Sequence, residues 1–305
     1  MAVDRCKLHF NGFWISFFAL LLASFFVLGF ALGDQVTPLL LRLSQGRDLQ
    51  ALIRQPTDVK SGERIPLVLL FGGFEEAGKV LGLFEPGVRV AVASFDYPFS
   101  PPRKFHFPGS FWNAPEAKRA AHLTLEGIGV LHKTFLEVSS RQYSPSILVG
   151  ASFGAPFAIA AAAAAADGGA HPYQGLVILH GFAKIPETAT ALIAKKWEKK
   201  AGILGRWAAW LVCRLSWAYL RFPSPEQSIP RLNSDLSVLM ISASQDSFVP
   251  KESTAALKEL FERSKVKFEF VELPGDHLQP GSDELIKKLK TLTVAWMKRE
   301  RLVGP

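Results

Sequence analysis

The chain is poor in sulfur, with two cysteines and three methionines among its 305 residues. Cys6 and Cys213 are far apart in the sequence, so they offer neither a disulfide framework nor the close spacing of a zinc site. The sequence contains no Asn-x-Ser/Thr sequon, no internal repeat and no nucleic-acid-binding motif with interleaved aromatic residues. These absences exclude a disulfide-stapled domain and a repeat protein, and we expect no metal, cofactor or nucleic acid as a partner.

Charge of one sign is not concentrated in long runs, although the formal net charge is +8. The densest basic group is Lys195, Lys196, Lys199 and Lys200, which we interpret as the solvated face of a helix. Hydrophobic residues make up 49% of the chain, which is enough for the core of one α/β domain with an insertion. The composition therefore favours a single globular domain of ordinary charge.

One long segment carries no charge at all, from Phe13 to Leu32. About 20 residues at roughly 1.5 Å each span the hydrocarbon core of a bilayer. Two interpretations remain open: a signal peptide cleaved after Ala31-Leu32-Gly33, or an uncleaved signal anchor. The apolar run exceeds the roughly 7–15 residues of a signal-peptide core, which favours the anchor.

Arg5 and Lys7 precede this segment, so the N-terminus is expected to stay in the cytoplasm and the rest to be exported. We therefore divide the chain into a signal anchor or signal peptide at residues 1–33 and a domain at residues 34–305. The domain is expected outside the cytoplasm, tethered to the membrane or, if the segment is cleaved, secreted. The oligomeric state is not indicated by the sequence.

The domain contains six short apolar runs. A mixed stretch at residues 34–64 precedes them, and we expect it to be a connector that leads to one or two short edge strands. Runs that do not alternate are typical of strands buried on both faces of a parallel sheet. The last run alternates, which indicates an edge strand. The six runs are Ile65–Phe71, Arg89–Phe95, Ser146–Gly150, Gly175–His180, Leu236–Ser242 and Lys267–Leu273.

Helical periodicity fills most of the intervals between these runs. An alternation of strands and helices predicts a doubly wound, mostly parallel α/β sheet. The six alanines from Ala161 to Ala166 fit a helix that packs closely on that sheet, since alanine is the best helix former. The predicted helices are Glu116–Val138, Ala155–Ala166, Glu252–Arg263 and Asp283–Lys298.

The rhythm is interrupted between Phe182 and Leu232, where no strand pattern occurs. This interval is predicted to form two or three helices, and it holds four of the seven tryptophans. We interpret it as a helical cap inserted over the carboxyl-terminal edge of the sheet. The four tryptophans are Trp197, Trp207, Trp210 and Trp217.

The strongest motif is Gly150-Ala151-Ser152-Phe153-Gly154, which has the form Gly-x-Ser-x-Gly. It lies between a predicted strand and a predicted helix, the context that a nucleophile elbow requires. Small neighbours allow strand and helix to close around the serine, and the helix N-terminus stabilises negative charge nearby. We predict that Ser152 is a catalytic nucleophile.

A nucleophilic serine needs a base and a third group that holds the base. For this motif class the partners follow in the order Asp or Glu, then His. Asp246 follows the fifth run and His277 the sixth, so both belong at the sheet edge where ligand sites gather. The predicted triad is Ser152, Asp246 and His277.

Four other polar residues are alternatives for this site or its lining. Asp276 adjoins His277, but neighbours in sequence rarely face each other; Asp235 precedes its strand and belongs at the opposite edge. Asp96 is a candidate site-lining carboxylate, and His180 either lines the pocket or is structural. The remaining histidines are expected at the surface or in packing: His106, His122, His132 and His171.

An oxyanion hole is expected from two backbone N–H groups. One belongs to Phe153, the residue after the nucleophile. The other is expected in the loop Phe71-Gly72-Gly73-Phe74, where glycines let the backbone approach a substrate closely. Phe74 is the preferred second donor, followed by Gly73.

Four segments together resemble the α/β-hydrolase superfamily: Phe71–Phe74, Gly150–Gly154, Gln245–Pro250 and Gly275–His277. They occur in the right order within residues 65–298. The resemblance implies an eight-stranded sheet, a Ser-Asp-His triad and a helical cap after the sixth strand, which matches residues 182–232. Phe71 departs from the His-Gly loop common in esterases, and a serine nucleophile argues against the dehalogenases.

These features predict a serine hydrolase that cleaves carboxylic esters, with an apolar or lipid-like part suggested by the aromatic residues of the cap. The partners expected are a small-molecule ester and, through the N-terminal segment, a membrane. Acyl transfer to an acceptor other than water and peptide cleavage use the same residues and stay open. A non-catalytic, membrane-tethered binding protein is a further alternative.

Overall fold

The computed structural model describes residues 34–57, 59–60, 63–73, 77–82, 88–98, 114–139, 143–168, 172–278 and 282–304. The predicted membrane segment and Phe74 lie outside these residues. Among the described helices, none is both long and apolar enough to cross a bilayer.

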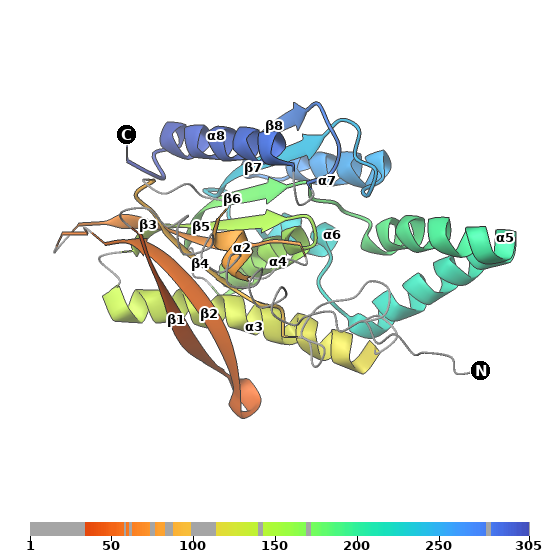
Figure 1. Cartoon of the computed structure of the whole chain (residues 1–305), viewed down its shortest axis with the longest axis horizontal. Coiled ribbons are helices and arrows are strands. Elements are labelled where there is room, and N and C mark those ends of the chain that lie inside the picture. The colour runs from red at the N-terminus through yellow and green to blue at the C-terminus, as the bar shows by residue number, and fades with distance from the viewer. Residues whose placement is uncertain are drawn as a thin grey trace, which may run out of the picture.

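A single eight-stranded sheet organises the domain, in the order β1-β2-β4-β3-β5-β6-β7-β8 (Figure 1). Strands β3 to β8 pair in parallel, whereas β1 and β2 join as an antiparallel hairpin that pairs antiparallel with β4. The strands are β1 (Asp34–Leu43), β2 (Arg47–Pro56), β3 (Ile65–Phe71), β4 (Ala91–Phe95), β5 (Tyr143–Ala151), β6 (Tyr173–Leu179), β7 (Ser237–Ala243) and β8 (Lys267–Leu273).

All six predicted strands are present, and the predicted mostly parallel sheet is confirmed. β3 and β4 are buried along their whole length, as continuous apolar runs require. The alternating run forms β8, which lies at one edge of the sheet. The hairpin at the other edge is longer than expected, since β1 and β2 have ten residues each instead of one or two short strands.

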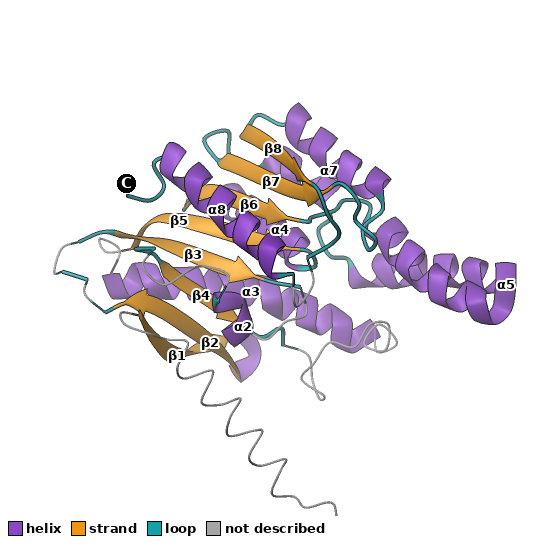
Figure 2. Ribbon diagram, turned by 45° about the horizontal axis from the view of Figure 1, so that its top comes forward, coloured by secondary structure: helices purple, strands orange, loops and turns teal. Residues whose placement is uncertain are grey.

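Helices cover both faces of the sheet (Figure 2). α3, α4 and α7 pack in one apolar cluster, and α2 and α8 pack in the cluster on the opposite face. The alanine-rich α4 is buried along its first ten residues, which explains its composition: small side chains let it approach the sheet closely. The helices are α2 (Ala77–Leu81), α3 (Ala114–Ser139), α4 (Gly154–Asp167), α5 (Ile185–Leu220), α6 (Pro225–Ser228), α7 (Lys251–Arg263) and α8 (Asp283–Arg299).

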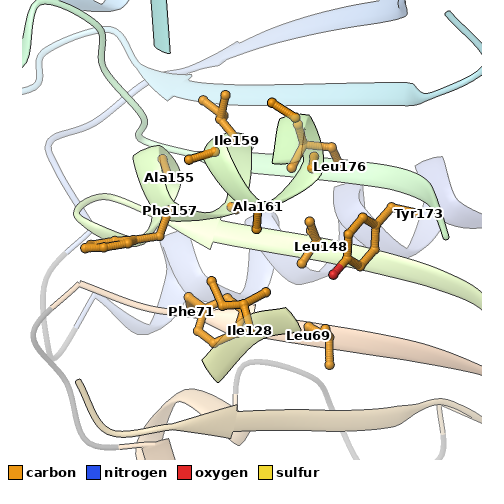
Figure 3. Close-up of a cluster of buried hydrophobic side chains, with 14 of the residues drawn as sticks. Leu69, Phe71, Ile128, Leu148, Ala155, Phe157, Ile159, Ala161, Tyr173 and Leu176 are labelled. Atoms are coloured by element: carbon orange, nitrogen blue, oxygen red, sulfur yellow. The ribbon is translucent and has the colours of Figure 1, made fainter. Parts of the chain in front are cut away.

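The larger cluster fixes the carboxyl-terminal end of β5 (Figure 3). Leu69 and Phe71 of β3, Leu148 of β5 and Ile159 of α4 are all fully buried in it. Burial of side chains of this size stabilises the fold by roughly 1.5–3 kcal/mol each. The turn that joins β5 to α4 is therefore held between two tightly packed elements.

Residues 182–232 contain no strand, and the α5 hairpin within them projects beyond the strand ends (Figure 1). Their main element, α5, is a helical hairpin of two legs rather than one straight helix. Its break is at Ala201 and Gly202, whose backbone leaves the helical region; Gly202 has φ 56° and ψ −141°, a conformation open mainly to glycine. The legs pack closely at Gly205, where a Cβ would lie 2.3 Å from the carbonyl oxygen of Trp197.

Candidate active site

Ser152 stands in the turn between β5 and α4 with φ 51°, a left-handed conformation that is rare for a residue with a side chain. The two glycines of the motif make this turn feasible. A Cβ on Gly150 would lie 2.7 Å from the Cα atom of Ala155, and one on Gly154 would lie 2.1 Å from the carbonyl oxygen of Phe71. Both spaces are closed to any side chain, so the motif is sterically required here.

The three predicted catalytic side chains meet at the carboxyl-terminal edge of the sheet. The Oγ atom of Ser152 lies 2.9 Å from Nε2 of His277, and Nδ1 of His277 lies 2.7 Å from Oδ2 of Asp246. His277 is 7% exposed, so its bonds form out of bulk water. A serine hydroxyl, an imidazole and a carboxylate thus form one hydrogen-bonded chain.

The carboxylate of Asp246 is anchored by backbone as well as by the imidazole. Its Oδ1 accepts hydrogen bonds from the N–H groups of Phe248 at 2.9 Å and Val249 at 2.7 Å. Burial alone would raise the pKa of this carboxyl, but the nearby His180 imidazole and the hydrogen bonds from His277 and Val249 outweigh it, and the pKa lies well below its ordinary range. Because Asp246 is ionised, His277 donates from Nδ1 and its Nε2 is left to accept the Ser152 proton.

Asp276 takes a different role from Asp246. Its Oδ1 accepts the Ser247 N–H at 2.7 Å and its Oδ2 accepts the Ser247 hydroxyl at 2.9 Å. Its Oδ1 also accepts the backbone N–H of His277 at 2.6 Å. These bonds lower the pKa of Asp276 and join the two loops that carry Asp246 and His277. Asp276 therefore connects the two loops by hydrogen bonds and is not bonded to the imidazole of His277.

The other two alternatives are Asp96 and Asp235. Asp96 accepts the backbone N–H of Ala77 at 2.7 Å, at the start of α2, and so stabilises that helix end. Asp235 is exposed and precedes β7, at the opposite end of the strand from Asp246. Of the packing histidines, His132 is buried, with Nε2 3.0 Å from the Ser146 hydroxyl.

His180 is closer to the site than the sequence revealed. It is 1% exposed and has φ 51°, and its ring packs edge-on against the ring of His277 with centroids 5.3 Å apart. Its Nδ1 lies 3.5 Å from Oδ2 of Asp246, which is longer than a normal hydrogen bond, so we attribute the lowered pKa of Asp246 mainly to His277 and the backbone. His180 contributes packing and electrostatics behind the pair.

His180, Asp246 and His277 each present a ligand atom within 4.8 Å of the others, a grouping that could also hold a metal ion. Two ligands of one zinc ion are roughly 3.3 Å apart when each bond is about 2.1 Å. Nδ1 of His277 and Oδ2 of Asp246 are 2.7 Å apart, which is a hydrogen-bond separation. The arrangement fits a proton shared between imidazole and carboxylate better than a cation between them.

Two of the three predicted oxyanion donors belong to the described residues. Phe153 follows Ser152 at the N-terminus of α4, and a Cβ on Gly73 would lie 3.8 Å from the Cβ of Ser152. Phe74 lies outside the described part of the chain. Both Phe153 and Gly73 are therefore near the serine, where developing negative charge would need them.

Tyr97 was missed by the sequence interpretation, although it lies two residues after the carboxyl-terminal end of a predicted strand. Its hydroxyl donates to the carbonyl oxygen of Gly72 at 2.6 Å, and burial raises the pKa of this phenol well above its ordinary value. Because the peptide is planar and trans, a Gly72 carbonyl turned toward Tyr97 turns the Gly73 N–H the opposite way. Tyr97 thus fixes the orientation of the predicted oxyanion loop.

An apolar pocket opens beside Phe153, between α3, α4 and both legs of α5. Its cavity volume is about 80 Å³, and all but one of its lining residues are apolar or aromatic or the thiol of Cys213. Tyr97, Phe153 and Phe157 meet in mutual ring contacts with centroids 5.3–5.5 Å apart, next to the nucleophile. The pocket can receive a small apolar group attached to a carbon held at Ser152.

No protein-family profile and no curated protein sequence matches this chain. Solved structures do match it. A carboxyl esterase from Bacillus coagulans superposes with a TM-score of 0.60 over 90% of this chain and 100% of its own, at 13% identity. The chain has an α/β-hydrolase fold.

Other α/β-hydrolase structures also superpose on most of this chain. An esterase from Pyrobaculum calidifontis gives a TM-score of 0.56 over 94% of each chain, at 14% identity. The acylaminoacyl peptidase of Pyrococcus horikoshii gives 0.60 at 11% identity, over 89% of this chain and 43% of its own. At such identities the likeness is one of fold, and an α/β-hydrolase fold supports many reactions.

Proposed function

We propose that this protein is a serine hydrolase that cleaves carboxylic esters with an apolar acyl group. The observation that carries the proposal is the hydrogen-bonded chain from Ser152 through His277 to Asp246, with separations of 2.9 Å and 2.7 Å. A left-handed serine at a strand-to-helix turn, paired with a buried imidazole, is the arrangement that activates a hydroxyl for attack on a carbonyl.

In the proposed reaction Ser152 attacks the ester carbonyl while His277 takes its proton at Nε2. Asp246 holds the imidazole in the tautomer that accepts and stabilises the imidazolium that forms. Backbone N–H groups of Phe153 and of Gly73 or Phe74 stabilise the oxyanion, a contribution worth roughly 10²–10³ in rate for each donor. His277 then protonates the leaving alcohol, and water attacks the acyl-enzyme by the same route.

The apolar pocket supports the choice of substrate. It adjoins Phe153, so an acyl chain bonded to Ser152 through its carbonyl would extend toward α5. The cavity volume of about 80 Å³ and the apolar lining fit a short acyl chain. We therefore propose short apolar acyl groups as substrates, and the hexanoyl ester serves as the test compound.

The test is turnover of p-nitrophenyl hexanoate by the full chain in detergent, with Ser152→Ala as the comparison. We expect the variant to lose activity by at least about 10³-fold, since the nucleophile cannot be replaced by another group of the site. Equal turnover by Ser152→Ala would refute the assignment of the nucleophile. Products formed with an added alcohol or amine acceptor would identify acyl transfer instead of hydrolysis.

A further inference from the structure

Large apolar side chains gather on the outer face of the second leg of α5. Seven of the ten large hydrophobic residues that are exposed in the described part of the chain belong to this one leg. Their spacing of three, four and seven residues puts them on one side of the helix. We call this face the α5 ridge: Ile203, Leu204, Trp207, Trp210, Leu211, Leu215 and Tyr219.

The ridge is not the face by which the leg is held to the protein. Ala209 and Cys213, on the opposite face, are buried against Ile193 and Ala194 of the first leg, and Leu220 is buried in the core. Leu204 is 73% exposed and Trp207 is 63% exposed, although both are strongly apolar. A helix that is apolar on its outer as well as its inner face needs a second apolar environment.

Positive charge lies beside the ridge, at the tip of the hairpin. Four exposed lysines occupy the last turns of the first leg, immediately before Ile203. Glu198 is the one acidic residue between 195 and 206, and it is paired with Arg206. The four lysines are Lys195, Lys196, Lys199 and Lys200. No acidic residue of the tip is left to offset their charges.

We propose that the α5 ridge is a membrane-contact surface that lies in the interface of an anionic bilayer. Tryptophan and tyrosine prefer the boundary between headgroups and acyl chains, and leucine and isoleucine are stabilised just below it. Anionic headgroups attract nearby lysines by about 1 kcal/mol each. The apolar ridge matches the acyl-chain boundary of such a surface, and the basic tip matches its anionic headgroups.

A protein partner fits these observations less well. The centre of a protein interface is depleted in lysine, whereas here the basic tip adjoins the most exposed apolar residues. The segment Phe13–Leu32, predicted from the sequence as a membrane anchor or signal peptide, would bring the domain to a bilayer surface. The inference concerns α5 alone and stands whether or not Ser152 is catalytic.

The N-terminal segment could bind the vesicles by itself, so binding of the whole chain does not test the ridge. The experiment therefore measures whether a label on the ridge lies within the bilayer. The full chain carries Cys6→Ser and Cys213→Ser, and a single cysteine replaces Leu211 in the ridge. This cysteine bears an environment-sensitive NBD fluorophore. The matched control carries its NBD at a cysteine that replaces Lys287. Lys287 is exposed on α8, which packs on the face of the sheet opposite to α3 and α4.

Both proteins are mixed with vesicles of phosphatidylcholine and phosphatidylglycerol at about 7:3, with and without brominated acyl chains. We expect about half of the emission at position 211 to be quenched by the brominated lipid and about a tenth at position 287. In vesicles of phosphatidylcholine alone, or with the four tip lysines replaced by glutamine, the quenching at 211 is expected to fall at least twofold.

Equal quenching at the two positions would overturn the proposal. A blue-shifted NBD signal at 211 that brominated lipid does not quench would also overturn it, because protein would then cover the ridge. Concentration-dependent loss of that signal would identify the cover as a second copy. A second label at Leu215, tested with circular dichroism, distinguishes a misfolded Leu211 variant from a ridge that stays in water.

Discussion

The two regions at the carboxyl-terminal edge of the sheet differ in how their side chains are held. Around Ser152, backbone atoms leave no space for a Cβ on Gly150 or Gly154, and every carboxylate oxygen of Asp246 has a hydrogen-bond donor. In the α5 hairpin, large apolar side chains are exposed instead, and the bend lies at Ala201 and Gly202. The first region holds its side chains by close packing and hydrogen bonds, and the second presents a surface.

This difference indicates which region suits catalysis and which suits apolar contact. A proton relay requires a rigid, fully bonded site, and the sheet edge provides one. The proposed selection of an apolar acyl chain and the proposed contact with a bilayer require apolar area rather than exact bonding, and α5 presents such area. Changes near Ser152 should therefore alter rate, whereas changes in α5 should alter substrate preference and surface behaviour.

The largest effect is expected from Asp246→Asn. The amide oxygen can still accept from Phe248 and Val249, which places the NH₂ group against Nδ1 of His277 and favours the wrong tautomer. We expect the kcat for p-nitrophenyl hexanoate to fall by about 10⁴-fold with the fold intact.

Asp276→Asn is the matched control, since Asp276 bonds to Ser247 and the backbone of His277 rather than to the imidazole ring. Its kcat is expected within about threefold of the parent, because an amide oxygen can keep one of those bonds. If Asp276→Asn lost activity as Asp246→Asn does, the assignment of the two carboxylates would be reversed.

A buried histidine of α3, outside both regions, predicts how stability depends on pH. Burial lowers the pKa of His132 to about 4, so the unfolded chain binds a proton below about pH 6.5 that the folded chain does not. Stability is therefore complete above pH 6.5 and decreases as the pH falls from 6.5 to 4, by up to about 3 kcal/mol. The lowered pKa of Asp246 adds a separate loss below about pH 4.

Urea unfolding at pH 7 and pH 4.5 measures the His132 contribution. In His132→Gln the side-chain amide can still bond to Ser146 without titrating, so the difference in unfolding free energy between the two pH values should shrink. An unchanged difference would show that another group causes the loss. Far-ultraviolet circular dichroism at both pH values checks that the variant is folded.

A smaller effect is expected in the pocket. Ala189 of the first leg lines the cavity, so Ala189→Phe should fill most of its volume of about 80 Å³. We expect kcat/KM for the hexanoyl ester to fall about tenfold while that for the acetyl ester changes less than twofold.

Ala255→Phe on α7 is the control, because Ala255 is exposed and does not line the pocket. It should leave the ratio of hexanoyl to acetyl turnover as in the parent. A p-nitrophenyl ester series from acetyl to dodecanoyl gives the comparison, and an unchanged optimum in Ala189→Phe would place the acyl group elsewhere.

The smallest effect is expected at the bend of α5. Gly202 has φ 56° and ψ −141°, and a Cβ there would meet no other atom within 4 Å, so only backbone strain opposes a side chain. Gly202→Ala should lower the unfolding free energy by about 1–2 kcal/mol, as measured in urea. Gly129 of α3 also has no atom within 4 Å of a Cβ but lies in a helix, so Gly129→Ala should stabilise.

Much of the fold could be predicted because buried parallel strands leave continuous apolar runs, as in Ile65–Phe71. One or two short edge strands were predicted for residues 34–64, but the length of β1 and β2 was not. Pro38 and several polar residues obscure the strand pattern, and the length is set by pairing of the two strands with each other and with β4. Two or three helices were predicted for residues 182–232, but the sequence did not reveal the packing of the two legs of α5, which depends on Gly205 meeting Trp197.

For the site, the placement of Ser152, Asp246 and His277 after their strands predicted which edge they share. Sequence position could not show that His180 packs behind Asp246, since its approach depends on the left-handed backbone after β6. Tyr97 was missed for a similar reason: the hydrogen bond to Gly72 crosses between two loops that only the folded sheet brings together.

The central claim is that Ser152 is an activated nucleophile, and its most direct test is covalent labelling. The folded full chain is treated with a fluorophosphonate probe, and the labelled peptide is identified by mass spectrometry, beside Ser152→Ala and heat-unfolded protein. We predict stoichiometric labelling at Ser152 that vanishes in both controls and slows about 10⁴-fold in Asp246→Asn. Absence of labelling in folded protein, or labelling that persists in Ser152→Ala, would contradict the account.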